Sequence, residues 1–514
     1  MNFLSKDRNQ TQIIGYSLDD FVPKDAKCRL VVSLVNELNL KNLYYRYSNQ
    51  GNPAFDPSAM LATWFLCYCE GETRTRKLEQ LCKRDLHFIY ISSNLQPDHT
   101  SLSRFRQANI DLMTEYFTQL VLLIKKKNLA QFNDIAIDGS KVQAFGSKTK
   151  SITQEGLSRE LKRIHQQIKD YLSACEDSDK GSEVDIPTIQ KKIKDLRNKK
   201  KQLLKHEQEI KKRQKQLKSE HRKNHRINLT EPDAFLMNKV NGSQKLPAYN
   251  AQVSIDTKTQ IIAANNVVQD RNDAHQFKQQ HKNVENNLGC DPDREYTTDS
   301  GYHSFEQLEY VEENQVKAVI ADKSPKSRSQ SKPVDQKNIK NKDKFDRSDF
   351  TYSKEEDYCR CPAGKKLVYN DMIKCHGRKS RRYKCFDCEG CKYRNKCFPR
   401  PNQDKYRQIV RDEKEHLAEK MYNTTQTEYG INKLVQRKYS VEGVFGNMKE
   451  NLGFRRFRLK GLSSVQGEFN MMCIAHNINK IYILFIKLFS PFYYIQIFKE
   501  RFISMKKQSV KYIN

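Results

Sequence analysis

The sequence lacks the hydrophobic segments that mark a secreted or membrane-spanning protein. Its first ten residues, MNFLSKDRNQ, contain no apolar core and no cleavage site, so we expect no signal peptide. The last apolar stretch, residues 481–498, is interrupted by Lys487 and Pro491, whereas a spanning helix is normally cleaner. We interpret it as a packing or interface helix within an apolar and basic tail of residues 481–514. A membrane span is the less favoured alternative, and we expect a cytoplasmic protein.

Acidic residues are scarce relative to basic ones. The chain has 62 Asp and Glu against 92 Lys and Arg, which gives a formal net charge of +30. This excess is spread along the chain and favours a polyanionic partner, most simply nucleic acid. A ribosomal protein or a protein that binds anionic membranes would fit the same charge. With 514 residues, the chain is too long for one compact core, and roughly two to four domains are expected.

Disulfide bonds are not expected in a reducing compartment, so the 14 cysteines need another explanation. Seven of them lie in residues 359–397. Cys385, Cys388, Cys391 and Cys397 recur at short spacing, and thiolates separated by two residues bind tetrahedral Zn²⁺ well. These four form our hypothesis for a structural zinc site. The additional cysteines leave open a second zinc ion, an iron–sulfur cluster or thiols without metal.

Residues 1–130 are predicted to form a helical domain. Residues 58–69 follow Asp56 and a proline, which is a helix-start signal. They are apolar almost all round, so this helix is expected to be buried. A second, amphipathic helix is predicted over residues 74–86.

A basic helix follows in the same domain. It begins after the polar turn at residues 97–100 and is expected to carry Arg104 and Arg106 on its surface. Short helices that lead into a basic helix fit a DNA-binding domain, and a plain helical bundle fits about as well.

Residues 151–228 differ in kind and are predicted to be a helical hairpin. One apolar seam comprises Leu161, Ile164, Ile168 and Leu172. A second seam repeats every seven residues at Ile189, Leu196, Leu203, Ile210 and Leu217. Such a repeat is typical of helices that pack along their length. The outer face is basic and would contact DNA or a second protomer, unless the hairpin is only a solvated spacer.

Short strands alternate with helices in the rest of the chain. The predicted strands cover residues 134–138, 249–255, 260–268, 294–298 and 316–320. Asp138 ends the first of them, before a turn at residues 139–141, and Asp299 ends the fourth. A carboxylate at a strand end is often catalytic in α/β folds and as often only a turn residue.

Other polar residues in this region are assigned structural roles. We expect Asp270 and Asp273 to begin a helix, and Ser304 with Gln307 to form a capping box for the next helix. Residues 323–350 are rich in Lys, Ser, Asp and Asn and are predicted to be a mobile linker.

Residues 437–460 are predicted to be a helix that carries one carboxylate among cations. Lys438, Glu442 and Lys449 are spaced by four and seven residues and so share one helix face. The basic residues that follow are Arg455, Arg456, Arg458 and Lys460. A lone acid beside a basic strip suits a metal-binding carboxylate next to a polyanion. An ordinary surface salt bridge is the plainer alternative.

Without its two insertions, the region has the strand and helix order of the ribonuclease H-like fold. We therefore predict an α/β fold for residues 131–480, with a mixed sheet and covering helices. The insertions are residues 151–228 and 323–405. The first and fourth strands are neighbours in this fold, and its last helix would deliver Glu442 to Asp138 and Asp299. Three carboxylates at one place need cations, and hard oxygen ligands suit Mg²⁺ or Mn²⁺.

Three blocks of sequence resemble the DDE transposases of bacterial insertion sequences. They are IDGSK (137–141), TDSGY (298–302) and YSVEGVFGNMKENLGFRRFRLKG (439–461). The segment PDHTSLSRFR (97–106) resembles the helical N-terminal domain of one branch of this family, and CPAGK with the later cysteines resembles its insert. The resemblance covers residues 15–480 and implies that Asp138, Asp299 and Glu442 are the catalytic, metal-binding acids.

The last helix departs from the pattern of related enzymes, which often show Tyr-x2-Arg-x3-Glu-x6-Lys. Glu442 and Lys449 fit, but Lys438 stands at the Arg position and Val435 at the Tyr position, with Arg437 beside them. The departure concerns DNA contacts more than metal chemistry. Asp256 is a rival for the second acid, but it lies in a tight turn where Asp is common.

The resemblance implies a cut-and-paste transposase. Water cleaves each transposon end, and the freed 3′-OH attacks target DNA. A homodimer that holds two ends of double-stranded DNA is expected, close to the nucleoid. The expected DNA-contacting residues are Arg104, Arg106, Arg437, Lys438, Lys449, Arg455, Arg456, Arg458 and Lys460. A non-catalytic DNA-binding protein and a metal-dependent nuclease without strand transfer are the alternatives.

Overall fold

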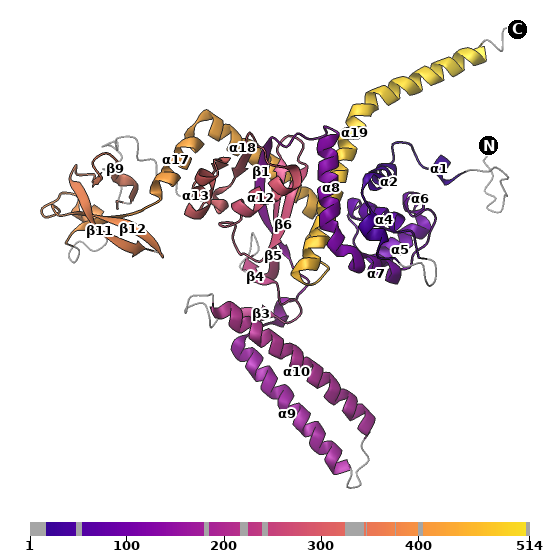
Figure 1. The fold of residues 1–514 in the computed structure, drawn as a ribbon, viewed down its shortest axis with the longest axis horizontal. Coiled ribbons are helices and arrows are strands. Elements are labelled where there is room, and N and C mark those ends of the chain that lie inside the picture. The colour runs from indigo at the N-terminus through magenta and orange to yellow at the C-terminus, as the bar shows by residue number, and fades with distance from the viewer. Residues whose placement is uncertain are drawn as a thin grey trace, which may run out of the picture.

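The computed structural model describes most of the chain. The described residues are 17–47, 54–178, 185–215, 225–238, 245–323, 344–345, 347–375, 377–398 and 405–509. Figure 1 shows a central sheet, a group of short helices beside it, a helical arm and a separate smaller sheet. The sheet and the short helices share one core, whereas the arm and the smaller sheet each have their own.

Short helices make up the N-terminal part of the described chain. They are α1 (Leu18–Phe21), α2 (Lys27–Glu37), α3 (Lys41–Tyr44), α4 (Pro57–Cys69), α5 (Thr75–Arg84), α6 (Leu86–Ile91), α7 (His99–Asn109) and α8 (Met113–Lys126). As predicted, Asp56 begins α4, because its side chain accepts a hydrogen bond from the backbone N–H of Ala59, and α4 is buried almost all round. The helix predicted over residues 74–86 is broken at Asp85, whose carboxylate begins α6.

Arg106 is buried, which corrects the prediction that it lies on the surface. Its guanidinium carbon lies 4.5 Å from the ring centroid of Trp64, and Nη1 donates to the carbonyl oxygen of Thr73 at 3.1 Å. Only 8% of the residue is exposed, whereas Arg104 one half-turn away is exposed. The sequence pattern missed this because Arg carries a long apolar stem that can pack on an aromatic ring. Arg106 therefore stabilises the helical group.

The main sheet is mixed, and β1 (Asp134–Gln143) is central in it. The other strands are β4 (Phe235–Asn238), β5 (Lys245–Asp256), β6 (Ile262–Val268), β7 (Glu295–Thr298) and β8 (Lys317–Ile320). The order is β6-β5-β1-β7-β8, and β4 pairs with the first part of β5. β5 is antiparallel to β1 and β6, whereas β7 is parallel to β1 and β8. Residues 139–141 continue β1, so the turn predicted there is wrong: each of them pairs with β5.

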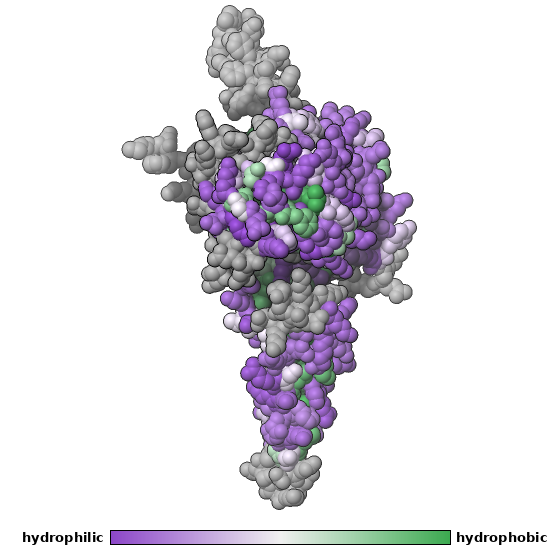
Figure 2. Space-filling model, turned by 90° about the vertical axis from the view of Figure 1, so that its left-hand side faces the viewer, coloured by the Kyte–Doolittle hydropathy of each residue, from purple (hydrophilic) through white to green (hydrophobic). Residues whose placement is uncertain are grey.

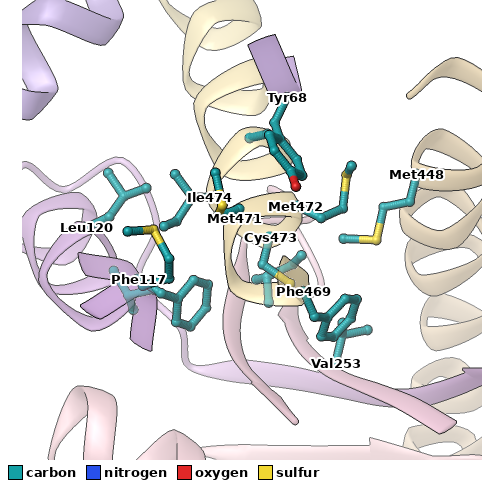
Figure 3. Packing of buried hydrophobic residues seen from close by; sticks show 14 of the residues in the cluster. Tyr68, Phe117, Leu120, Val253, Met448, Phe469, Met471, Met472, Cys473 and Ile474 are labelled. Atoms are coloured by element: carbon teal, nitrogen blue, oxygen red, sulfur yellow. The ribbon is translucent and has the colours of Figure 1, made fainter. Parts of the chain in front are cut away.

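One helix joins the helical group to the main sheet. The long helix α19 (Leu462–Ser509) packs against α4 and α8 on one side and against β6 on the other. In Figure 3, Met471 and Ile474 of α19 face Phe117 and Leu120 of α8. Because the side chains from both parts belong to one buried cluster, the N-terminal helices are fixed against the sheet. Among the residues that the structure describes, no helix has the length and apolarity needed to cross a membrane.

The remaining helices of the sheet region differ in detail from the sequence prediction. They are α12 (Phe277–Leu288), α13 (Phe305–Glu313), α17 (Glu415–Gln426) and α18 (Glu428–Gly446). Asp273 does not begin a helix, because α12 starts four residues later. The capping box is also wrong: Ser304 donates to the carbonyl of Ala274, and the Gln307 side chain accepts from the backbone of Lys278. Tertiary contacts thus replaced the local ones.

The helix predicted over residues 437–460 is shorter. After α18 a π-helical turn, Asn447–Asn451, continues to Leu452, and residues 453–461 form a loop. Gly453 has φ +62°, a conformation that ends a helix at little cost only for glycine. The four basic residues between 455 and 460 therefore lie on a loop.

A helical pair projects from the sheet region as an arm (Figure 1). It comprises α9 (Gln154–Ser178) and α10 (Ile186–Lys215), and its base is the two-stranded sheet of β2 (Ser151–Thr153) and β3 (Arg226–Asn228). Its fully or largely buried residues include Leu157, Ile164, Ile168, Ile193, Leu203 and Ile210. The two predicted seams thus pack on each other, although Leu172 is 39% exposed and Leu217 lies outside the described residues. Figure 2 shows a mainly hydrophilic surface along the arm.

The smaller sheet contains the cysteines of the 359–397 segment. Its strands are β9 (Thr351–Ser353), β10 (Tyr358–Arg360), β11 (Lys366–Cys375), β12 (Arg378–Cys385) and β13 (Arg407–Asp412), all antiparallel. A short helix, α16 (Arg394–Cys397), lies beside it. Most of the linker predicted at 323–350 lies outside the described residues.

The position of Arg106 predicts different effects for two neighbouring substitutions. Arg106→Gln should lower the free energy of unfolding by about 2–3 kcal/mol, because it removes a buried cation–π contact and leaves the Thr73 carbonyl without its donor. Arg104→Gln, at an exposed position, should change it by no more than about 0.5 kcal/mol. Urea unfolding of both variants measures the difference, and equal effects would contradict the structural role of Arg106.

Candidate active site

Asp138 and Asp299 lie side by side on two inner strands of the main sheet, Asp138 within β1 and Asp299 directly after β7. β1 and β7 are parallel neighbours with Ala136 paired to Thr297, and each acid is two residues beyond that pair. The strand order predicts this arrangement, because parallel neighbours bring equivalent positions to the same level. Asp256 is placed elsewhere: its carboxylate accepts from the backbone and hydroxyl of Thr259 in a tight turn, as expected of a turn residue.

Arg437 of α18 connects the two acids. Its Nη2 donates to Asp138 Oδ1 at 2.8 Å and lies 3.6 Å from Asp299 Oδ2. Its Nε donates to the carbonyl of Ile137 at 3.3 Å, which fixes the guanidinium against β1. The side chain is only 12% exposed, so the charge interactions are poorly screened by water. The structure therefore gives Arg437 the role of counter-charge to the acids, whereas the sequence predicted a DNA contact.

The environment of Asp138 raises the pKa of its carboxyl group to about 6. Burial is the largest cause, and the negative charges of Asp299 and Asp273 act in the same direction. The charge of Arg437 and the backbone N–H of Gly139 lower the pKa but do not compensate. A carboxylate of this kind is stabilised by any further cation placed beside it.

Asp273 is a residue of this site that the sequence analysis missed. Its Oδ1 accepts from Asn250 Nδ2 at 2.7 Å and from Gln252 Nε2 at 2.6 Å, both on β5. A Cβ atom on Gly139 would lie 2.6 Å from the same oxygen, so the glycine permits this close approach. The spacing of nearby residues could not predict the position of Asp273, because its hydrogen bonds join a loop to residues of β5 that are distant in sequence.

Glu442 is exposed on α18 and makes no ion pair or hydrogen bond with any residue that the structure describes. It lies five residues after Arg437 on the same helix. In the described ranges, no three His, Cys, Asp or Glu side chains converge closely enough to hold a metal ion. The predicted meeting of all three acids thus stays a prediction, and two of the three are together in this structure.

Lys449 reaches the acidic site from the turn after α18. Its Nζ donates to the hydroxyl of Ser140, two residues beyond Asp138. Burial lowers the pKa of Lys449, and the nearby charge of Asp138 partly opposes this shift. Lys438 is exposed on α18 itself. A cation thus stands beside the acids, at the place where a bound polyanion would need one.

The basic loop, residues 453–461, is fixed to the far end of β1. The backbone N–H of Phe457 donates to the carbonyl of Gln143, and the fully buried carboxylate of Glu468 accepts from the backbone of Arg458 and Leu459. Gln143 is five residues beyond Asp138, or about 16 Å along the strand. Arg456 and Lys460 both lie over the ring of Phe145. A rigid basic surface therefore continues from the acidic site.

The individual cations of the basic loop differ in their contacts. Arg458 Nε donates to Thr73 Oγ1 at 2.5 Å, which joins the loop to the N-terminal helices. Arg455 pairs with Glu450 at the surface, and both side chains are about two-thirds exposed. Surface ion pairs of this kind are weak, so Arg455 can exchange its partner for a phosphate at little cost.

The cysteines of the smaller sheet form one neighbourhood. Cys385 and Cys388 are buried, and the Cys388 thiol donates to the Cys385 carbonyl at 3.3 Å. Nearby Cys361, Cys388 and Cys391 all act to raise the pKa of Cys397, which reaches about 11 with burial as the main cause. Cys361 therefore belongs to this group, although the sequence analysis left it out of the four proposed ligands. Zinc binding itself stays a prediction of the cysteine spacing.

The donor chemistry where β1 and β7 lie side by side fits a divalent cation. Asp138 and Asp299 offer hard carboxylate oxygens, which Mg²⁺ and Mn²⁺ prefer. The pKa of Asp138 is raised mainly by burial, and the charge of Arg437 does not fully offset this effect. Glu442 is an unpaired carboxylate of the helix that already contacts both acids.

The raised pKa predicts a pH-dependent loss of stability that depends on Asp138. The folded protein holds this proton up to about pH 6, whereas an unfolded chain releases it near pH 4. The native protein should therefore lose stability relative to Asp138→Asn as pH rises from about 4 to about 6, by at most about 3 kcal/mol. Urea unfolding of both proteins in the absence of divalent cations measures this gap. A gap that stays constant over this range would contradict the raised pKa of the half-buried Asp138.

Two family models match the chain. Residues 360–482, which contain Glu442 and the basic loop, match the family described as "Transposase DDE domain". Residues 16–108, which contain most of the N-terminal helices, match "Transposase domain (DUF772)". No curated protein matches the chain. The two matches flank the strands that bring Asp138 and Asp299 together, and they support a DDE transposase of an insertion sequence.

Proposed function

We propose that this transposase cleaves the ends of its element and joins them to target DNA, with Asp138, Asp299 and Glu442 as ligands of Mg²⁺ or Mn²⁺. One observation carries the proposal. Two acids on neighbouring strands are held by one guanidinium, and that guanidinium comes from the helix that carries Glu442. The third acid is thus on the helix whose guanidinium contacts the first two.

The sheet supports assignment to the ribonuclease H-like fold. In the order β6-β5-β1-β7-β8, only β5 runs against the other four strands. The long arm interrupts the connection from β1 to β5, and the cysteine-containing sheet precedes the last helices. We accordingly propose residues 131–480 as one catalytic domain with two insertions, after a DNA-binding domain of residues 1–130.

The chain's own residues have separable tasks in this proposal. When bound, the divalent cation supplies the positive charge that stabilises the attacking and leaving oxygens of a phosphodiester displacement. Asp138 must be deprotonated to bind it, so protons compete with the cation and activity should fall as the pH is lowered. Arg437 keeps the acids together before the cation binds, and Lys449 holds a phosphate beside Ser140.

The DNA would follow the basic surface from the acidic site along the loop. Arg455, Arg456, Arg458 and Lys460 lie there, and Lys438 and Arg104 are exposed elsewhere on the protein. Two ends must meet before transfer, so we propose a homodimer on DNA and a location at the nucleoid. Arg106 is not included, because it is buried.

The test compares two substitutions on the same helix. Glu442→Gln should lower Mg²⁺-dependent cleavage of a duplex that carries the element's end by about 1,000-fold, a loss of several kcal/mol of charge stabilisation. Transfer of a pre-cut end with a free 3′-OH into a plasmid should fall equally. Glu428→Gln removes the same charge from an exposed position in the first turn of α18 and serves as the control.

The outcomes separate the alternatives. Equal cleavage by native protein and Glu442→Gln, at equal DNA binding, would exclude Glu442 as a ligand. Cleavage without transfer of the pre-cut end would favour a nuclease. If the native protein binds the duplex but cleaves it with neither Mg²⁺ nor Mn²⁺, the result would favour a non-catalytic DNA-binding protein.

A further inference from the structure

The second helix of the arm carries an unusual concentration of positive charge. α10 contains twelve Lys and Arg but only three Asp and Glu, whereas its partner α9 contains four basic and five acidic residues. The two helices pack on each other through one apolar core. The arm is therefore basic on one side only, and its charge does not follow from the packing of the hairpin.

Seven cations of α10 form a single stripe, which we call the α10 stripe. It comprises Lys191, Lys194, Arg197, Lys201, Lys205, Lys212 and Lys215, all exposed. At 3.6 residues per turn, these positions fall within about one third of the helix circumference. Leu203 and Ile210 are buried on the opposite side, so the stripe points away from α9. Of the acids of α10, Glu207 lies on another face, whereas Glu209 lies at the edge of the stripe and pairs with Arg213.

The α10 stripe makes no ion pair with any residue in the described parts of the chain. Three acids of the arm are bound to other cations: Glu160 to Lys199 at 3.0 Å, Glu207 to Lys211 at 3.0 Å and Glu209 to Arg213 at 2.6 Å. Self-repulsion along one helix face destabilises an isolated helix. An external polyanion would relieve it.

The dimensions and composition of the stripe fit duplex DNA. From Lys191 to Lys215 it is about 36 Å long, which is about one turn of B-DNA. A duplex carries about one negative charge per 1.7 Å, so every cation of the stripe can find a phosphate. α10 contains no Phe, Tyr or Trp, and single-stranded DNA is normally held by stacking on such rings. The ligand class is therefore the phosphate backbone of a duplex.

We propose that the α10 stripe is a second DNA-binding surface, which holds duplex DNA by its backbone at a distance from the acidic site. The inference rests on the proposed action on DNA. The arm projects from the sheet region, so DNA on the stripe lies beyond the segment at the acids (Figure 1). Binding by the stripe should not depend on base sequence, because Lys side chains that contact phosphates do not distinguish one base from another. Its task is to steady the flanking or target duplex.

Two triple variants of the full chain test this surface. Lys194→Gln, Lys201→Gln and Lys205→Gln together remove three charges from the stripe. Arg159→Gln, Lys162→Gln and Lys169→Gln remove three exposed charges from α9, where acids lie among them. Both variants change the net charge equally, and Gln keeps a helix propensity close to that of Lys and Arg. Circular dichroism before and after heating checks that both arms remain folded.

The measurement is the affinity for a duplex of unrelated sequence over a series of salt concentrations. The plot of log affinity against log salt should become shallower by about 2.7 for the stripe variant, or about 0.9 for each lost phosphate contact. The α9 variant should keep the native slope. Equal slopes for the stripe variant and the native protein would overturn the proposal. An acidic protein partner would then be the better candidate for the ligand of the stripe. An equal decrease of the slope in both variants would also contradict the proposal, because the effect would then come from net charge and not from the position of the stripe.

A second readout separates this inference from the proposed function. At low salt and saturating protein, the stripe variant should still cleave the end duplex, because the acids and the basic loop are unchanged. If the stripe variant shows the predicted shallower slope but the native protein never cleaves the duplex, the catalytic proposal fails and the stripe stands. If the stripe variant alone loses cleavage at saturation while keeping the native slope, the stripe acts on catalysis and not as a DNA-binding surface.

Discussion

Negative charges held together where β1 and β7 lie side by side are the constraint on which the rest of the site depends. Asp138 and Asp299 lie next to each other because β1 and β7 are parallel neighbours. The negative charge of Asp273, in the loop before α12, also acts on Asp138. Without a cation these groups would repel each other and favour protonation. Arg437 provides that cation from α18. The position of α18 across the sheet is thus coupled to the charge state of the acids.

The surroundings are built to keep this arrangement rigid. β1 carries Asp138 in its middle and the basic loop at its far end, and the buried carboxylate of Glu468 holds that loop by its backbone. Glu468 belongs to α19, which also packs on the N-terminal helices. A DNA strand that contacts the N-terminal helices, the loop and the acids would therefore meet surfaces that are fixed relative to one another. Rigid positioning of this kind is what phosphodiester displacement requires.

The sequence predicted those features that local patterns determine. Helix α4 followed from its Asp-Pro start and continuous apolarity, the arm from its heptad spacing, and the adjacency of Asp138 and Asp299 from strand order. Features set by tertiary contacts could not be predicted in this way. Asp273 contacts β5 instead of beginning a helix, and Arg106 stacks on Trp64 inside the helical group. Cys361 joins the other cysteines only through the folding of the smaller sheet.

The central claim is that Asp138 and Asp299 belong to a divalent cation site, and that the Arg437 guanidinium provides the positive charge there when no cation is bound. Direct titration of the DNA-free protein with Mn²⁺, followed by the electron paramagnetic resonance signal of the free ion, tests it. The account predicts binding by the native protein, weaker binding by Asp138→Asn, and tighter binding by Arg437→Gln because a competing positive charge is gone. Equal Mn²⁺ affinity in the native protein and both variants would contradict it.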